Sequence, residues 1–415
     1  MPRLFLAALF ASALSLHATE YYVDPAVGDD HANGLAAKPE GANGPMKTIA
    51  RAIKAAKPGD TVNLAKANYK ESAIFHNRAG EAGKPITLDG HGAMLDGADA
   101  LNPDDWKEVS PGLFHNDNLL RLDDAVIQRW FFLWDGKMNH MGRTSKGLRP
   151  DFKKPADLQP GEWSFIKDPA QNGPNGQIHG AFFVKLPPGQ KLADAHIAAP
   201  IRSAGVAISG DNSWITIRNI NATHVYNDGY NIHGKCRDVL FEHIGAFECG
   251  DDGISAHDDC QYKVDGLVSI GNSTGIADTG DSITEYDHVY IDGILGVDLL
   301  FFGANRHAIH NGVVLSHAHT VASVYTAEPN TGKLSLTLDN VFIRRDVAPA
   351  EARVGKDATL DLQHVTMLGF HLLAVDDGKI IAQDTVFGLA PEKNGLWGAA
   401  RGAKAGELLK ELTPR

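Results

Sequence analysis

The pattern of hydrophobic and polar positions repeats itself in the middle of the chain. Residues 215–236 (ITIRNINATHVYNDGYNIHGKC) align without a gap with residues 239–260 (VLFEHIGAFECGDDGISAHDDC), each position matching the one 24 residues later. A repeat of this length indicates a solenoid, in which each coil buries its apolar side against its neighbours. Short runs of Val, Ile, Leu and Phe are punctuated by Gly, Asn and Asp, which favours coils of β-strands over helix pairs. The pattern therefore predicts an all-β, right-handed parallel β-helix.

The rest of the chain divides around these coils. Residues 19–100 are expected to hold an N-terminal cap and the first coils, because Ile49, Ala52, Ile53 and Ala56 have the spacing of an amphipathic helix. Such a helix would cover the open end of the solenoid. Residues 101–200 break the rhythm with several short aromatic strands, which predicts a small inserted β subdomain. The main coils are predicted over 201–389, followed by a C-terminal tail or cap over 390–415.

Charge and the first residues limit the partners and the location. The 39 basic and 51 acidic residues give a net charge of −12, which opposes binding to nucleic acid. Residues 1–18 have the basic start, apolar run and small final residue of a secretory signal peptide. No later segment reaches the ~20 apolar residues of a membrane span. We therefore expect a secreted or periplasmic monomer without membrane insertion.

Three cysteines leave at least one thiol unpaired in an exported protein. Cys236 and Cys260 occupy the same place on adjacent coils, at a separation that a disulfide accepts. A disulfide and a stack of two buried thiols are both consistent with this placement.

The repeat also brings polar side chains into columns. Equivalent residues of adjacent coils lie roughly 4.8 Å apart. Because Ile232 and Ile254 should point inward, the alternate positions should share one solvent-facing side. The columns expected on that side are Asn227 with Asp251, Asn231 with Ser255, and His233 with His257. Asp228 and Asp252 fall at the turn beside them.

Carboxylates this close repel one another unless they share a proton, hold a cation or stay hydrated. A shared proton would give a catalytic acid and base, and a cation site made of oxygen ligands would suit Ca²⁺. Hydrated Asn and Asp ladders, in contrast, simply stabilise turns. All three alternatives remain open at this point.

The opening segment, YYVDP followed by GDDHANG and PMKTIARAIKAAKPGDTVNLAKANYKES, resembles pectin-lyase-like β-helix proteins, including pectate lyases of polysaccharide lyase family 9. That resemblance implies a Ca²⁺ site formed by Asp228, Asp251 and Asp252, with Ser255 at the fourth ligand position. It also implies a lysine base one or two coils downstream. Arg306 is the only Lys or Arg between Lys263 and Lys333, so Arg306 or His257 would have to take that role.

The same aspartates resemble the NTD and DD motifs of family 28 glycoside hydrolases, although Thr274 stands where that family has histidine. This likeness implies inverting hydrolysis by a pair of aspartates. Asp278, on the following coil, would extend a substrate groove lined by Asn227, Asn231 and His233.

We therefore expect an exported enzyme that cleaves glycosidic bonds of a polysaccharide, first by Ca²⁺-assisted elimination. Inverting hydrolysis and a non-catalytic glycan-binding scaffold are the alternatives.

Overall fold

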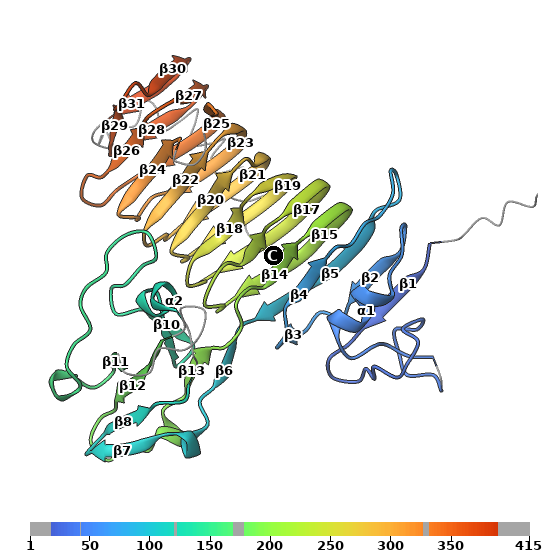
Figure 1. Cartoon of the computed structure of the whole chain (residues 1–415), viewed down its shortest axis with the longest axis vertical. Coiled ribbons are helices and arrows are strands. Elements are labelled where there is room, and N and C mark those ends of the chain that lie inside the picture. The colour runs from blue at the N-terminus through green and yellow to red at the C-terminus, as the bar shows by residue number, and fades with distance from the viewer. Residues whose placement is uncertain (1–17, 42, 120–122, 169–177, 327–331, 389–415) are drawn as a thin grey trace, which may run out of the picture.

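A computed structural model describes residues 18–41, 43–119, 123–168, 178–326 and 332–388, which form a parallel β-helix with an inserted subdomain on one side (Figure 1). The predicted fold class is confirmed. The expected tail at 390–415 and all but the last residue of the expected signal peptide lie outside the described residues. No helix among the described residues is long and apolar enough to cross a membrane.

Two parallel sheets form the walls of the solenoid. The main path of the larger sheet consists of β1 (Glu20–Val23), β2 (Thr61–Leu64), β5 (Ile86–Asp96), β15 (Asp211–Thr223), β17 (Lys235–Phe247), β19 (Asp259–Ile270), β21 (Ile283–Asp292), β23 (Asn305–Leu315), β25 (Leu334–Arg344), β27 (Ala358–Gln363) and β30 (Lys379–Gln383). The short strands β3 (Asn68–Tyr69), β28 (Thr366–Leu368) and β31 (Val386–Gly388) flank this path. We call this the large sheet.

The second wall is a nine-stranded sheet, which we call the short-strand sheet. It contains β4 (Ala73–His76), β14 (Val206–Ser209), β16 (Tyr230–Ile232), β18 (Asp252–Ala256), β20 (Thr274–Gly280), β22 (Val297–Gly303), β24 (Thr320–Tyr325), β26 (Glu351–Val354) and β29 (His371–Ala374).

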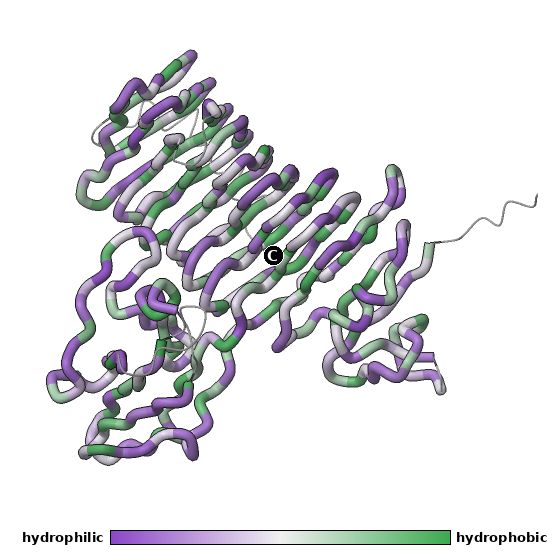
Figure 2. The backbone as a smooth tube through the Cα atoms, in the orientation of Figure 1, coloured by the Kyte–Doolittle hydropathy of each residue, from purple (hydrophilic) through white to green (hydrophobic). Residues whose placement is uncertain are grey.

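Alternation along each strand builds the core between these walls. In the large sheet, Ile217, Phe241, Val264 and Tyr286 are successive register partners, and all are buried. Figure 2 shows hydrophilic and hydrophobic residues alternating along the coils. Side chains on one parity therefore form continuous inward ladders, while the other parity faces outward.

The long strands bend where a residue adopts a positive φ. Asn219, His243, His288 and Asn311 occupy this bend on β15, β17, β21 and β23, with φ between 50° and 55°, and Gly266 occupies it on β19 with φ 84°. Asn and His are among the residues that tolerate this conformation best. The bend is thus repeated at one corner of the solenoid.

The predicted capping helix is present as α1 (Ile49–Ala55). The Thr48 hydroxyl accepts a hydrogen bond from the backbone N–H of Arg51, and Ile49, Ala52 and Ile53 are buried. The helix thus covers the first apolar coil as its spacing predicted.

The inserted subdomain consists of two antiparallel four-stranded sheets. One contains β10 (Lys137–Asn139), β9 (Phe132–Trp134), β13 (Ile197–Pro200) and β6 (Ala98–Ala100); the other contains β11 (Trp163–Asp168), β12 (His179–Lys185), β8 (Leu113–Asn116) and β7 (Lys107–Ser110). Short 3₁₀ helices cover Pro103–Asp105, Pro155–Asp157 and Leu192–Asp194.

An aromatic core of Trp130, Phe132, Trp163 and Phe182 holds the subdomain together. Within the segment 101–200, which was predicted to consist of short strands, one stretch is instead a short helix, α2 (Asp124–Gln128). The Asp123 carboxylate caps this helix by accepting from the N–H of Val126. This local cap outweighs the β propensity of Val126 and Ile127.

Of the two alternatives for Cys236 and Cys260, the structure shows the stack of two buried thiols and not the disulfide. Cys236 and Cys260 are register partners in β17 and β19, as the repeat predicted. Both are buried free thiols, as is Cys249.

Candidate functional site

Three aspartates meet where two successive coils enter the short-strand sheet. Asp228 lies in the turn before β16, and Asp251 and Asp252 stand at the start of β18. The backbone N–H of Asp252 donates to Asp228 Oδ1 at 3.1 Å, which ties the two coils together at this point. We call these three residues the Asp cluster.

The glycine after each aspartate turn is required by packing. A Cβ at Gly229 would lie 2.7 Å from the Ala246 Cβ, and one at Gly253 would lie 2.3 Å from the Ser269 Oγ. No side chain fits at these inward positions, so the backbone can pass close to the neighbouring wall only with glycine. The repeated Asp-Gly pair therefore fixes each aspartate at the rim of the sheet.

The Asp cluster is compact and buried. One oxygen from each carboxylate lies within 4.8 Å of the others. Asp228 and Asp252 are 2% exposed and Asp251 is 8% exposed. The open solvent face that the sequence pattern predicted here is in fact covered by the inserted subdomain.

Two cations of the inserted subdomain reach the cluster. The Lys146 Nζ lies 2.5 Å from Asp251 Oδ1 and 2.6 Å from Asp252 Oδ1. The Arg129 Nη1 lies 3.2 Å from Asp251 Oδ2, and its Nη2 donates to the Asn227 side chain. The inserted subdomain thus places one lysine and one arginine beside the aspartates.

The segment that carries Lys146 is anchored on the solenoid. The Ser145 backbone N–H donates to the Ser273 Oγ at 2.7 Å, and the two hydroxyls also hydrogen-bond. Nearby, Trp130 stacks on Tyr226 with ring centroids 6.3 Å apart. These contacts hold the segments that carry Lys146 and Arg129 against the solenoid.

The pKa values of the three carboxyls are driven in different directions. Burial opposes ionisation of Asp251, but the charges of Lys146 and Arg129 outweigh it and hold the pKa of Asp251 below its usual value. Burial and the charge of Asp251 raise the pKa of Asp252 well above its usual value. The same two causes raise the pKa of Asp228 to about 6.

Lys146 stays charged in this setting. Burial disfavours its ammonium form, but the charges of Asp252, Asp251 and Asp228 raise its pKa above the ordinary value. An amine held this way is a poor proton acceptor. Its role in the observed state is that of a cation.

The predicted columns beside the cluster are present. Asn231 and Ser255 are register partners, and the Ser255 hydroxyl donates to Asp228 Oδ2 at 2.8 Å. The rings of His233 and His257 stack with centroids 4.1 Å apart and nearly parallel planes. Burial, followed by the charge of His233, lowers the pKa of His257 to about 4, so His257 is neutral at pH 7.

Asp278 does not extend the groove, which corrects the sequence prediction. It is the register partner of Ala256, whose side chain points into the core, and it is fully buried. Its carboxylate accepts hydrogen bonds from Tyr262, Tyr286 and Thr284 at 2.6–3.0 Å. Asp278 therefore belongs to an interior polar network.

The prediction that Arg306 could act as a base beside the aspartates is also wrong. It lies on β23 of the large sheet, whereas the Asp cluster belongs to the short-strand sheet. There it lines a groove of about 820 Å³ together with Trp214, Lys263 and His310. Arg306 is therefore not available to the aspartates as a base.

The residues present do not fit the Ca²⁺ site that the family resemblance implied. Ca²⁺ takes six to eight oxygen ligands. Here the carboxylate oxygens of Asp251 and Asp252 are already paired with Lys146, and Ser255 donates its hydroxyl to Asp228. Burial of the cluster leaves little room for the water ligands that would have to complete the shell.

Comparison with known proteins does not assign the chain to a family. No family model and no curated protein matches the sequence. The solved complex of XylC with xylose aligns over 90% of this chain and 86% of its own, with a TM-score of 0.43 and 9% identity. A glycoside hydrolase aligns over 92% and 98%, with a TM-score of 0.46 and 11% identity. Pectate lyase Pel9A aligns over 89% and 79%, with a TM-score of 0.41 and 11% identity.

Identities this low do not transfer an activity to this chain.

Proposed function

We propose that this protein is a carbohydrate-active enzyme that hydrolyses glycosidic bonds at the Asp cluster. The observation that carries the proposal is the meeting of three carboxylates with Lys146 and Arg129 at the boundary between the solenoid and the inserted subdomain. Two carboxyls with opposite pKa shifts are what acid-assisted glycoside cleavage requires.

In this proposal Asp252 is the general acid. Burial and the charge of Asp251 raise the pKa of Asp252, which favours the protonated carboxyl, and that proton would pass to the leaving glycosidic oxygen. Asp251 is ionised and would stabilise the positive charge that develops at the sugar, or attack it directly. Lys146 and Arg129 keep Asp251 in the charged form.

The distance between the carboxyls bears on whether hydrolysis retains or inverts the configuration at the sugar. Inverting enzymes hold their two carboxyls roughly 6.5–9.5 Å apart to leave room for a water molecule, whereas retaining enzymes use about 5 Å. In the Asp cluster, oxygens of all three carboxylates lie within 4.8 Å. This spacing favours a retaining over an inverting hydrolysis.

Substrate would approach through Lys146. The side chain of Lys146 is 27% exposed, whereas those of Asp251 and Asp252 are 11% and 4% exposed. A sugar that reaches the carboxyls therefore has to move the ammonium aside, which leaves Arg129 to hold Asp251 in the charged form.

Ca²⁺-assisted elimination is less well supported than hydrolysis. It needs a metal bound by the aspartates and a neutral base. The carboxylates here are paired with a lysine whose charge they stabilise.

A non-catalytic role is the second candidate. The burial of all three carboxyls, neutralised by two cations of the insert, is also what a latch between the insert and the solenoid would need. A glycan-binding scaffold would then use other surfaces.

Activity on acidic and neutral polysaccharides tests the proposal, with both new reducing ends and ultraviolet absorbance of unsaturated ends recorded. We expect reducing ends without absorbance, unaffected by chelator. Asp252→Asn should lower the rate by at least about 100-fold, while Asp265→Asn on the exposed face of the large sheet should leave it unchanged.

Absorbance that chelator abolishes would instead establish elimination. No activity on any substrate, together with variants that unfold at a lower temperature than wild type, would support the latch.

A further inference from the structure

The Asp cluster has to be neutralised by the protein itself. Three carboxylates within 4.8 Å repel one another strongly when solvent is excluded. Hydration cannot relieve this repulsion, because none of the three residues is more than 8% exposed. A cation has to sit among them, or protons have to be taken up.

Lys146 stands where such a cation would be bound. Its Nζ lies 2.5 and 2.6 Å from one oxygen each of Asp251 and Asp252. Ca²⁺ lies 2.3–2.6 Å from its oxygen ligands, so the ammonium nitrogen occupies the position that an ion bridging these two carboxylates would take.

The other groups around the Asp cluster suit a cation that carries less charge than Ca²⁺. Ser255 approaches Asp228 as a hydrogen-bond donor at 2.8 Å and adds no negative charge. Arg129 neutralises the second oxygen of Asp251 from the other side. Two single charges from the insert therefore replace one double charge from solution.

We infer that Lys146 is a tethered cation that takes the place of a divalent metal ion in the Asp cluster. The intact protein then does not bind Ca²⁺ at this site, and removal of the ammonium uncovers a Ca²⁺ site. This inference does not depend on the proposed hydrolysis, because it concerns only what neutralises the carboxylates.

Calcium titration of the full-length protein, followed by calorimetry and by thermal unfolding, tests the inference. Wild type should show no binding that requires Asp251, and its melting temperature should not change with Ca²⁺ or chelator. Lys146→Ala should melt several degrees lower than wild type, and millimolar Ca²⁺ should restore much of the loss.

Three matched variants sharpen the test. Lys146→Arg keeps the charge and should stay indifferent to Ca²⁺. Lys153→Ala, which removes an exposed ion pair with Glu162 in the same subdomain, should change neither stability nor Ca²⁺ response. Adding Ser255→Asp to Lys146→Ala supplies a fourth carboxylate and should tighten Ca²⁺ binding at least 10-fold.

Ca²⁺ binding by wild type that is lost in Asp251→Asn would overturn the inference. So would a folded Lys146→Ala that ignores Ca²⁺ with and without Ser255→Asp. If Lys146→Ala folds only when Ca²⁺ is present during refolding, the inference stands, because Lys146→Arg and wild type fold without it.

Discussion

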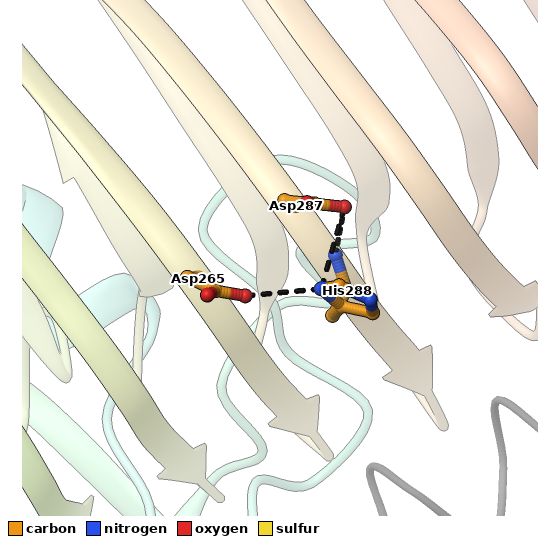
Figure 3. Close-up of side chains that lie close together, drawn as sticks. All are labelled: Asp265, Asp287 and His288. Carbon is orange, nitrogen blue, oxygen red and sulfur yellow. Dashed lines mark hydrogen bonds and ion pairs between the residues drawn. The ribbon is translucent and has the colours of Figure 1, made fainter.

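The Asp cluster and a second group, Asp265, Asp287 and His288, invite comparison because each brings three groups able to bind a metal within 4.8 Å of one another. The second group lies on the outer face of the large sheet, where His288 Nδ1 is 3.0 Å from Asp265 Oδ1 and 3.4 Å from Asp287 Oδ1 (Figure 3). The side chains of Asp265, Asp287 and His288 are 56%, 41% and 38% exposed. We call this group the open cluster.

Solvent exposure decides which partners each cluster needs to neutralise its charge. Solvent screens the open cluster, so a histidine and the Asn311 amide, which donates to Asp287 at 2.7 Å, are sufficient partners. The Asp cluster is closed off from water and is met by two cations from another subdomain. Similar ligands in two environments thus have different consequences for stability and chemistry.

Asp251→Ala should produce the largest difference between the two clusters. It leaves Lys146 and Arg129 partly buried with fewer acidic partners, and the loss of one member of a buried ion pair costs ~3–5 kcal/mol in the free energy of unfolding. The matched change Asp265→Ala should cost less than about 1 kcal/mol. Denaturant unfolding of both variants measures this difference.

Equal losses for Asp251→Ala and Asp265→Ala would mean that the contacts of Lys146 are too weak to distinguish the clusters. The two charges of the insert would then contribute little to its docking.

Asp278 provides an intermediate case, a carboxyl that is fully buried but hydrogen-bonded to neutral hydroxyls. Burial raises its pKa from 3.8 to about 6. The native state therefore holds the proton more tightly than the unfolded chain does. This stabilisation is complete below about pH 4 and is lost as the pH rises through about 6.

Asp278→Asn removes this dependence because the amide does not ionise. Between pH 4 and pH 7 the unfolding free energy of the variant should therefore gain roughly 3 kcal/mol relative to that of wild type. Other buried acids, such as Asp298, titrate in both proteins and cancel in the difference. A difference that stays constant with pH would show that the hydroxyls keep the carboxylate ionised.

The repeat made much of the fold predictable. The 24-residue self-match correctly paired Cys236 with Cys260 and Asn231 with Ser255, because equivalent residues of adjacent coils are register partners in a parallel ladder. The spacing of Ile49, Ala52 and Ile53 correctly predicted the capping helix. Local periodicity was sufficient for both features.

The same register already contained the signal that Asp278 faces inward. The Gly253-Ile254 pair recurs as Gly275-Ile276, which sets Asp278 beside Ala256. Carboxylates usually face solvent, and the interior hydroxyls of Tyr262, Tyr286 and Thr284 make Asp278 an exception.

Lys146 had no comparable signal. It lies 105 residues before Asp251, in a segment outside the repeat, so neither periodicity nor motif spacing connects the two. Only the docking of the inserted subdomain on the solenoid brings the ammonium to the carboxylates. Burial of the Asp cluster was missed for the same reason, because the repeat describes the solenoid without its cover.

The smallest effect is expected for the open cluster itself. His288→Ala and Asp287→Asn should each change the unfolding free energy by less than about 0.5 kcal/mol, because exposed ion pairs are weak.

At 1 M salt the screening length falls to about 3 Å, so the coupling between His288 and Asp265 in a double-mutant cycle should vanish. The coupling between Lys146 and Asp252 should persist under the same conditions, because the buried pair is poorly reached by mobile ions. Coupling energies that decline together with salt would mean that solvent reaches the Asp cluster as freely as it reaches the open one, and the distinction between the two clusters would fail.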